Sequence, residues 1–122
     1  MKKSIFLTFV LSASAFAISS HAAPNVENGK TLYDAKCAKC HGKTGGGDGK
    51  SAKALNTTPT KFNDPTTFTD KKKLEITPDE RMAKAIKEGG EAVKQSKEMD
   101  KFPSYSDQDI QDILAYIKTF AK

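Results

Sequence analysis

The sequence has few of the residue types from which most metal and cofactor sites in proteins are built. Its 122 residues include no tryptophan, only two cysteines and only two histidines. Two cysteines allow at most one disulfide bond, so a disulfide-stapled framework is excluded. The formal net charge is +5, which is too small an excess for a nucleic-acid-binding surface. A chain of this length forms one domain at most.

The sequence also lacks an apolar run long enough to span a bilayer, which takes about 20 residues. Its longest run, residues 5–18, follows two lysines and precedes small residues. This is the layout of an export signal, and it fits an uncleaved anchor less well because the run is short. We predict a Sec-type signal peptide over residues 1–22, cut between Ala22 and Ala23, and a domain over residues 23–122. The mature domain would then be periplasmic and soluble, with no transmembrane segment.

Three segments of the predicted domain have helical patterns. The segment over residues 25–36 begins with a cap at Asn25. The segment over residues 77–88 begins with a capping box and is followed by a glycine pair. The third segment starts at Ser106 and carries apolar residues at helical spacing, namely Ile110, Ile113, Leu114 and Ile117. We find neither a strand pattern nor an internal repeat. The sequence predicts an all-α domain of three or four short helices.

The stretch over residues 42–73 is rich in Gly, Thr, Asn, Asp, Pro and Lys and has no sustained period. A loop this long is uncommon inside a small domain. It makes physical sense if the loop surrounds something other than protein, and such a group would also add apolar volume to a core of about 100 residues.

Both cysteines stand in the motif CAKCH, residues 37–41. A redox-active C-x-x-C would require a βαβ context, which is absent. A structural zinc site requires four ligands, but Cys37, Cys40 and His41 are the only cysteines and histidine left once His21 departs with the signal. The remaining interpretation is covalent attachment of one haem c, with His41 binding its iron. An incidental disulfide in a colourless protein is the alternative.

The second axial position of the iron separates an electron carrier from an enzyme. No second histidine remains, so methionine is the first choice, and Met82 and Met99 are the two that survive processing. Met82 shares a helical face with Ile86, as a core methionine would. Met99 lies in an irregular stretch that could pass over a haem. Residue chemistry favours Met99, while lysine ligation or an open site stays as the alternative.

These motifs resemble the class I c-type cytochromes over essentially the whole mature chain. GKTLYDAKCAKCHG resembles the first helix of that family, with a small residue at Gly29 and an aromatic at Tyr33. In the family these two residues pack against the C-terminal helix, which we expect here at Leu114 and at residues 116–117. EMDKFPSYSDQDIQDILAYIKTF resembles the family's end, with an axial methionine, a short loop, a cap and a Tyr-containing helix.

The resemblance implies a bacterial monohaem electron carrier with the cytochrome c fold, which is not an enzyme, and with His41 and Met99 as axial ligands. It also implies a proline whose carbonyl accepts the proton of the axial histidine, and the match is Pro59, with Pro65 as the alternative. One departure is that many members place proline directly after the axial methionine, whereas Asp100 follows Met99 here.

A carrier of this kind exchanges electrons with redox partner proteins, which the sequence does not identify. Lysines flank the motif and the methionine segment, at positions 36, 39, 43, 50, 53, 94, 97 and 101. They could form a docking surface, but interspersed acids favour a merely solvated surface. We expect a monomer that binds no nucleic acid. The alternative function is a haem protein with an open sixth site, acting as a peroxidase-like enzyme or a small-ligand binder.

Overall fold

The computed structural model describes residues 22–69 and 76–122. The predicted signal peptide up to His21 and the lysines at positions 71–73 lie outside the described residues. Within them the chain forms four α-helices: α1 (Val26–Lys36), α2 (Ala38–His41), α3 (Pro78–Glu88) and α4 (Asp107–Ile117). Four short 3-10 helices, and no strand, complete this described part: η1 (Ala52–Ala54), η2 (Pro65–Phe68), η3 (Gly90–Val93) and η4 (Lys118–Phe120). The all-α prediction is confirmed.

The three predicted helices begin and end close to the predicted residues because their caps are local. The Asn25 side chain accepts hydrogen bonds from the first turn of α1. Capping boxes open the other two, Thr77 with Glu80 in α3 and Ser106 with Asp109 in α4. α3 stops at Gly89, whose φ of 92° is a conformation that favours glycine.

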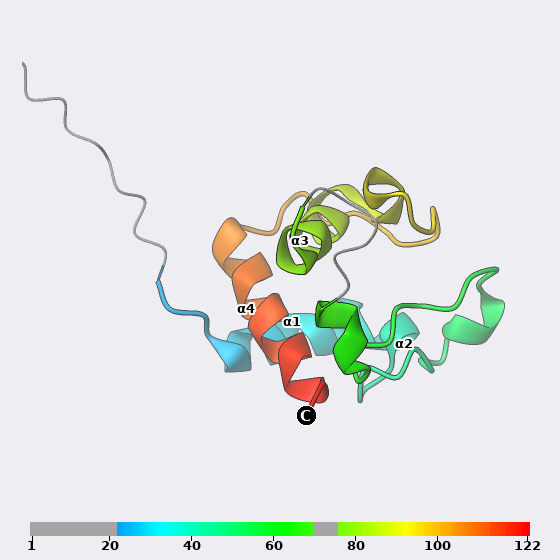
Figure 1. Ribbon diagram of the computed structural model, residues 1–122, viewed down its shortest axis with the longest axis horizontal. Helices are drawn as coiled ribbons and strands as arrows, with labels where there is room; N and C mark the ends of the chain where they lie inside the picture. Colours follow the sequence, from blue (N-terminus) through cyan, green and yellow to red (C-terminus); the bar gives the residue numbers. More distant parts are fainter. Residues whose placement is uncertain (1–21, 70–75) are drawn as a thin grey trace, which may run out of the picture.

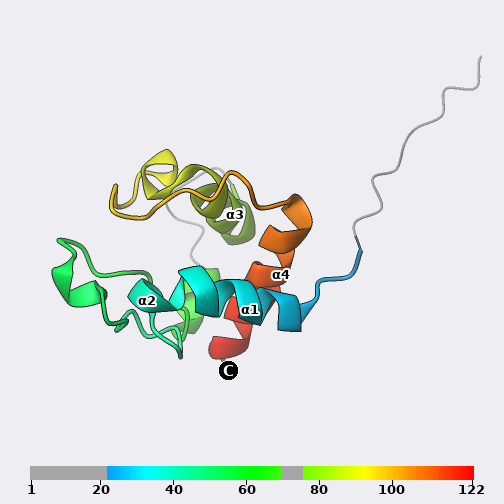
Figure 2. The same ribbon diagram turned by 180° about the vertical axis from the view of Figure 1, so that it is seen from behind.

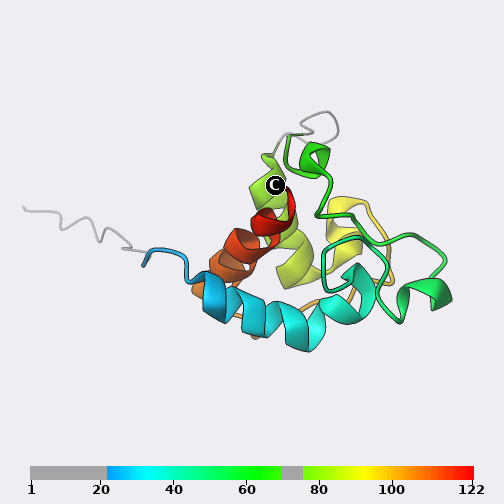
Figure 3. The ribbon, with the colours of Figure 1, turned by 90° about the horizontal axis from the view of Figure 1, so that it is seen from below.

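α1 and α4 cross one another near Gly29 (Figure 3). A Cβ atom at this position would overlap the carbonyl oxygen of Asp112 and lie 3.0 Å from the backbone nitrogen of Ile113. The crossing therefore requires glycine. The predicted packing of Gly29 and Tyr33 against α4 is confirmed: Gly29 lies against Asp112 and Ile113, just before the predicted Leu114, and Tyr33 reaches Tyr116, with ring centroids 5.4 Å apart.

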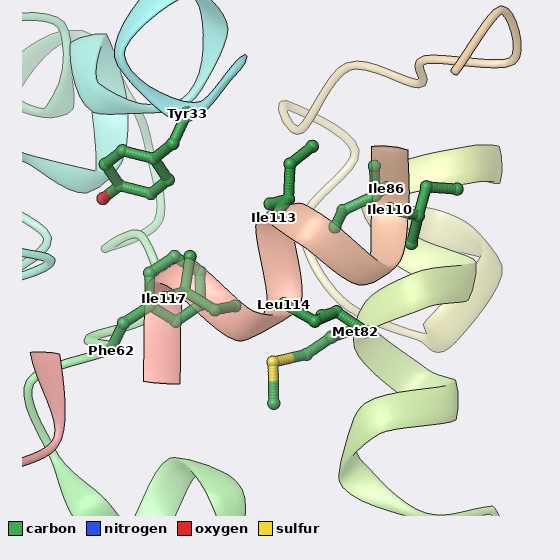
Figure 4. Packing of buried hydrophobic residues seen from close by; sticks show 8 residues of the cluster. All are labelled: Tyr33, Phe62, Met82, Ile86, Ile110, Ile113, Leu114 and Ile117. Carbon is green, nitrogen blue, oxygen red and sulfur yellow. The ribbon is translucent and has the colours of Figure 1, made fainter. Parts of the chain in front are cut away.

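The hydrophobic core lies around this crossing and between α4 and α3 (Figure 4). Four side chains are almost completely buried: Tyr33, Ile113, Leu114 and Ile117. Met82 and Ile86 extend from α3 toward α4, and Ile110 and Phe62 complete the cluster. Burying each large apolar side chain contributes about 1.5–3 kcal/mol. The predicted core face of α4 is confirmed.

Tyr33 also connects this core to the loop that follows α2. Its hydroxyl donates a hydrogen bond to the carbonyl of Gly42, at 2.7 Å, in a buried position. Burial raises the pKa of Tyr33 well above its ordinary value, so the hydroxyl keeps its proton. The ring packs against Phe120 at the end of the chain, with centroids 5.4 Å apart. Tyr33 thus connects the start of the long loop to the core and to the C-terminal end of the chain.

α3 and η3 lie on one side of α4, and α1, α2 and the loop after them lie on the other (Figures 1 and 2). An ion pair between Lys118 and Asp79 joins the C-terminal end of the chain to the first turn of α3. Of the helices in the part of the chain that the structure describes, none has the length and apolar character needed to cross a membrane.

Candidate haem-binding site

The CAKCH segment and the segment before α4 both line a cavity of about 500 Å³. Its lining includes Cys37, Cys40 and His41 as well as Met99. The volume falls within the range of about 300–1,000 Å³ that is usual for cofactor pockets. Apolar lining is supplied by Leu55, Pro59 and Phe102. The structure therefore brings together, at one cavity, all four residues predicted to attach or ligate haem.

The cysteines lie on a single tight turn. Cys37 ends α1 and begins α2, and its carbonyl accepts hydrogen bonds from the backbone nitrogens of Cys40, at 3.1 Å, and His41, at 2.9 Å. Both side chains are free thiols. Burial, reinforced by Cys40, raises the pKa of Cys37 to about 11. The uncharged thiol is unlike the low-pKa thiolate of a redox-active C-x-x-C, which agrees with the sequence-based exclusion of that function.

The ring of His41 is held in one orientation. Its Nδ1 lies 3.0 Å from the carbonyl oxygen of Thr60 and, since a carbonyl only accepts, Nδ1 carries the proton. Phe62 stacks on the other side of the ring, with centroids 4.7 Å apart. Burial lowers the pKa of His41, and the Thr60 bond offsets this only in part. The imidazole is therefore neutral at pH 7, with the Nε2 lone pair free for a metal.

The prediction that Pro59 supplies the carbonyl to His41 was wrong by one residue, and Pro65, in η2, does not supply it either. The Pro59 carbonyl instead faces Gly47, where an added Cβ would lie 2.7 Å from its oxygen. The ring of Pro59 still lines the cavity. Thr60 carries no sequence signal of its own, because any residue can offer a backbone carbonyl.

The two candidate methionines occupy different environments. Met99 is partly buried and lines the cavity, and its Cβ packs against Gly90, where an added Cβ would lie 3.1 Å away. Met82 is 9% exposed, belongs to the core cluster, and is absent from the lining of the cavity. Among the described residues, no three His, Cys, Asp or Glu side chains converge as a metal site. Besides the two cysteines, Met99 is the sulfur-bearing side chain in the lining of the cavity.

A comparison with protein-family models gives a match to the cytochrome c family over residues 26–121. The chain belongs to the cytochrome c family. No curated protein matches the chain in a sequence comparison. Cys37 and Cys40 of this cytochrome c domain fit the C-x-x-C-H haem-binding motif. Family membership indicates a haem c electron carrier rather than an enzyme, with redox proteins as partners.

The residues around the cavity of the cytochrome c domain fit a covalently bound haem. Two thiols, a neutral imidazole and a thioether line one apolar-walled space. Among the apolar residues that follow the motif, Leu55 lines the cavity, Phe68 packs against the core and Ile76 is 36% exposed. Phe102 and Glu98 also line the cavity and were not predicted from the sequence.

The lysines of the cytochrome c domain do not form a uniformly basic surface. Lys36 and Lys39 line the cavity, but Lys39 lies 4.0 Å from a carboxylate oxygen of Asp100. Lys97 pairs with Glu91 at 3.3 Å. Because acids neutralise part of the positive charge next to the cavity, these contacts favour the solvated-surface interpretation over a strong docking surface.

Proposed function

We propose that this cytochrome c domain is a periplasmic electron carrier that holds one haem c with His41 and Met99 as axial ligands. One observation carries the proposal: Cys37, Cys40, His41 and Met99 line the same cavity although Met99 is remote in sequence. Bound there, haem c supplies an iron that alternates between the ferrous and ferric states. With two protein ligands on the iron, electron transfer is favoured over substrate chemistry.

Each of these residues has a separate task. Cys37 and Cys40 form the thioether bonds that attach the porphyrin. His41 presents Nε2 because its Nδ1–H donates to the Thr60 carbonyl, and this bond fixes the ring and increases its basicity. Met99 offers a thioether, a ligand that raises the reduction potential. Leu55 and Phe102 reduce the access of water to the cavity.

The proposal includes export and processing. Residues 1–22 would be removed as a signal peptide, which leaves a domain over residues 23–122. This boundary is supported by Asn25, whose cap of α1 begins the folded part just after the cut. We further propose a monomer whose redox partners approach the exposed edge of the cavity, where basic and acidic residues alternate.

Optical spectra of the purified, exported protein test the ligand pair. We would compare the wild type with Met99→Leu and with its matched control Met82→Leu, since leucine keeps the volume and removes the sulfur. We expect a low-spin c-type spectrum with the weak red thioether-to-iron band in the wild type and in Met82→Leu. Met99→Leu should lose the band.

The opposite results would be equally clear. Loss of the band in Met82→Leu alone would transfer the ligand role to Met82. A high-spin wild type that binds cyanide or carbon monoxide at neutral pH would overturn the carrier proposal in favour of the open-site enzyme or ligand binder.

A further inference from the structure

Glu98, the residue before Met99, connects two distant parts of the chain. Its Oε1 accepts hydrogen bonds from the backbone nitrogen and the side-chain amide of Asn56, both at 2.9 Å. Its Oε2 accepts from the backbone nitrogen of Thr57 at 3.2 Å and from the Thr57 hydroxyl at 3.0 Å. These donors are 42 and 41 residues away in sequence. The Glu98 carboxylate therefore joins the loop that contains Asn56 and Thr57 to the segment that contains Met99.

Both loops line the cavity. Thr57 to Thr60 belong to its lining, where Thr60 holds His41, and so do Ser96, Glu98 and Met99. Seen from below, the loop through residue 56 and the segment through residue 98 lie near one another (Figure 3). The Glu98 contacts thus join the loop that holds His41 to the segment that carries Met99.

Other contacts hold Met99 less firmly. The hydrogen bond from the Gly90 nitrogen to the Met99 carbonyl is 3.4 Å long, and the one from the Met99 nitrogen to Ser96 is 3.5 Å long. Both are at the limit of a hydrogen bond. The next firm backbone bond is from Phe102 to Ile86, at 2.8 Å. Met99 also packs at the edge of the core, but among the hydrogen bonds of this segment those of the Glu98 carboxylate are the strong ones nearest to Met99 in sequence.

We propose that Glu98 is a positioning residue that holds the Met99 thioether against the haem by tying the methionine segment to Asn56 and Thr57. The proposal rests on the proposed function, in which Met99 binds the iron. Ser96 assists, because its hydroxyl accepts from the Glu98 nitrogen at 3.1 Å and donates to Oε2 at 3.3 Å.

The test compares Glu98→Ala and Glu98→Gln with Glu91→Ala in the haem-loaded protein. Glu91 is a matched control, since it lies in the same region, loses the same charge, and makes an exposed ion pair with Lys97. The readouts are the thioether-to-iron band and the rate at which imidazole displaces the methionine. We expect Glu98→Ala to weaken the band and to speed displacement by about tenfold, as loss of charge-assisted hydrogen bonds allows.

In Glu98→Gln, the strength of the band and the rate of displacement should lie between those of the wild type and Glu98→Ala. The amide oxygen replaces one acceptor of the carboxylate, and the NH₂ group replaces none. Thr57→Val checks the connection from the other loop. If the Thr57 hydroxyl acts through Glu98, Thr57→Val should speed displacement in the wild type and add nothing in the Glu98→Ala background.

Suppose that the wild type shows the band and that Glu98→Ala has the same band and displacement rate as Glu91→Ala. That result would overturn this inference and leave the proposed ligand pair intact. Fully additive effects of Thr57→Val and Glu98→Ala would also overturn it. A wild type without the band would overturn the proposed ligation and this inference together.

Discussion

The crossing of α1 and α4 and the walls of the cavity are held together in different ways. At the crossing, Gly29 brings two backbones together and large side chains such as Ile113 and Leu114 are almost completely buried. The cavity walls are the short α2 turn and loops whose residues are partly exposed, and Glu98 joins two of these loops through hydrogen bonds. Packing between two helices holds the crossing together, and hydrogen bonds between polar groups hold the cavity walls together.

This difference indicates a division of labour. Burial of apolar surface stabilises the crossing without any ligand, because the two helices supply complementary surfaces to one another. In the segments that line the cavity, Met99 and Phe102 pack only at the edge of the core. Individual hydrogen bonds also position these segments, and the His41–Thr60 contact and the Glu98 contacts are the clearest. Substitutions at the crossing should therefore change the global stability of the domain. Substitutions at the cavity should change the geometry of the iron ligands.

The largest expected effect is that of Gly29→Ala. The new Cβ would overlap the Asp112 carbonyl, and backbone atoms at a helix crossing have little room to move. We expect a loss of about 3 kcal/mol or more in the free energy of unfolding. Gly46→Ala is the matched loop control, since its Cβ would meet the end of the Asp48 side chain at 3.1 Å. Denaturant titration should show a much smaller loss there; equal losses would refute the proposed division.

Tyr33→Phe should have the next largest effect, because this residue belongs to both regions. The substitution leaves the buried Gly42 carbonyl without the hydroxyl that donates to it at 2.7 Å. We expect a loss of about 1–3 kcal/mol in thermal or denaturant unfolding. Tyr116→Phe is the control, since the Tyr116 hydroxyl makes no hydrogen bond to another described residue. Similar losses in both variants would show that the Gly42 bond contributes little.

A smaller, pH-dependent effect should separate the two hydrogen-bonded carboxylates. Asp112, 2% exposed, accepts bonds from the Asn25 nitrogen and the side chains of Asn28 and Gln108. Burial raises the pKa of Asp112, but these bonds outweigh it, so the pKa lies below its ordinary value. A depressed pKa stabilises the fold above the ordinary carboxyl pKa of about 3.9, and this stabilisation is lost as the pH falls through the folded-state value.

Asp112→Asn should therefore lower the free energy of unfolding by about 1–2 kcal/mol at pH 7 and by less below about pH 4. Glu98→Gln, on the exposed cavity wall, should change stability little while it changes the thioether band. Unfolding measured from pH 7 down to pH 2 checks both variants. A stability difference for Asp112→Asn that does not vary with pH would contradict the role assigned to its charge.

Much of the fold could be predicted from the sequence because its signals are local. A cap and the residue three positions later determine where α3 and α4 begin, and Gly89 ends α3 within the same few residues. The family resemblance correctly predicted that Gly29 and Tyr33 pack against the C-terminal helix, but Gly29 meets Asp112 and Ile113, which precede the predicted Leu114. The exact register of two packed helices depends on side chains from both, which a pattern in one helix does not contain.

By itself, the sequence determined that Cys37, Cys40 and His41 lie close together, since they fall within five consecutive residues. The sequence already favoured Met99 over Met82, and the tertiary structure places Met99 at the cavity and Met82 in the core. Only the tertiary structure decided that Thr60, and not Pro59, faces His41. The direction of a backbone carbonyl depends on the path of the whole loop, and that path is fixed by contacts with residues distant in sequence.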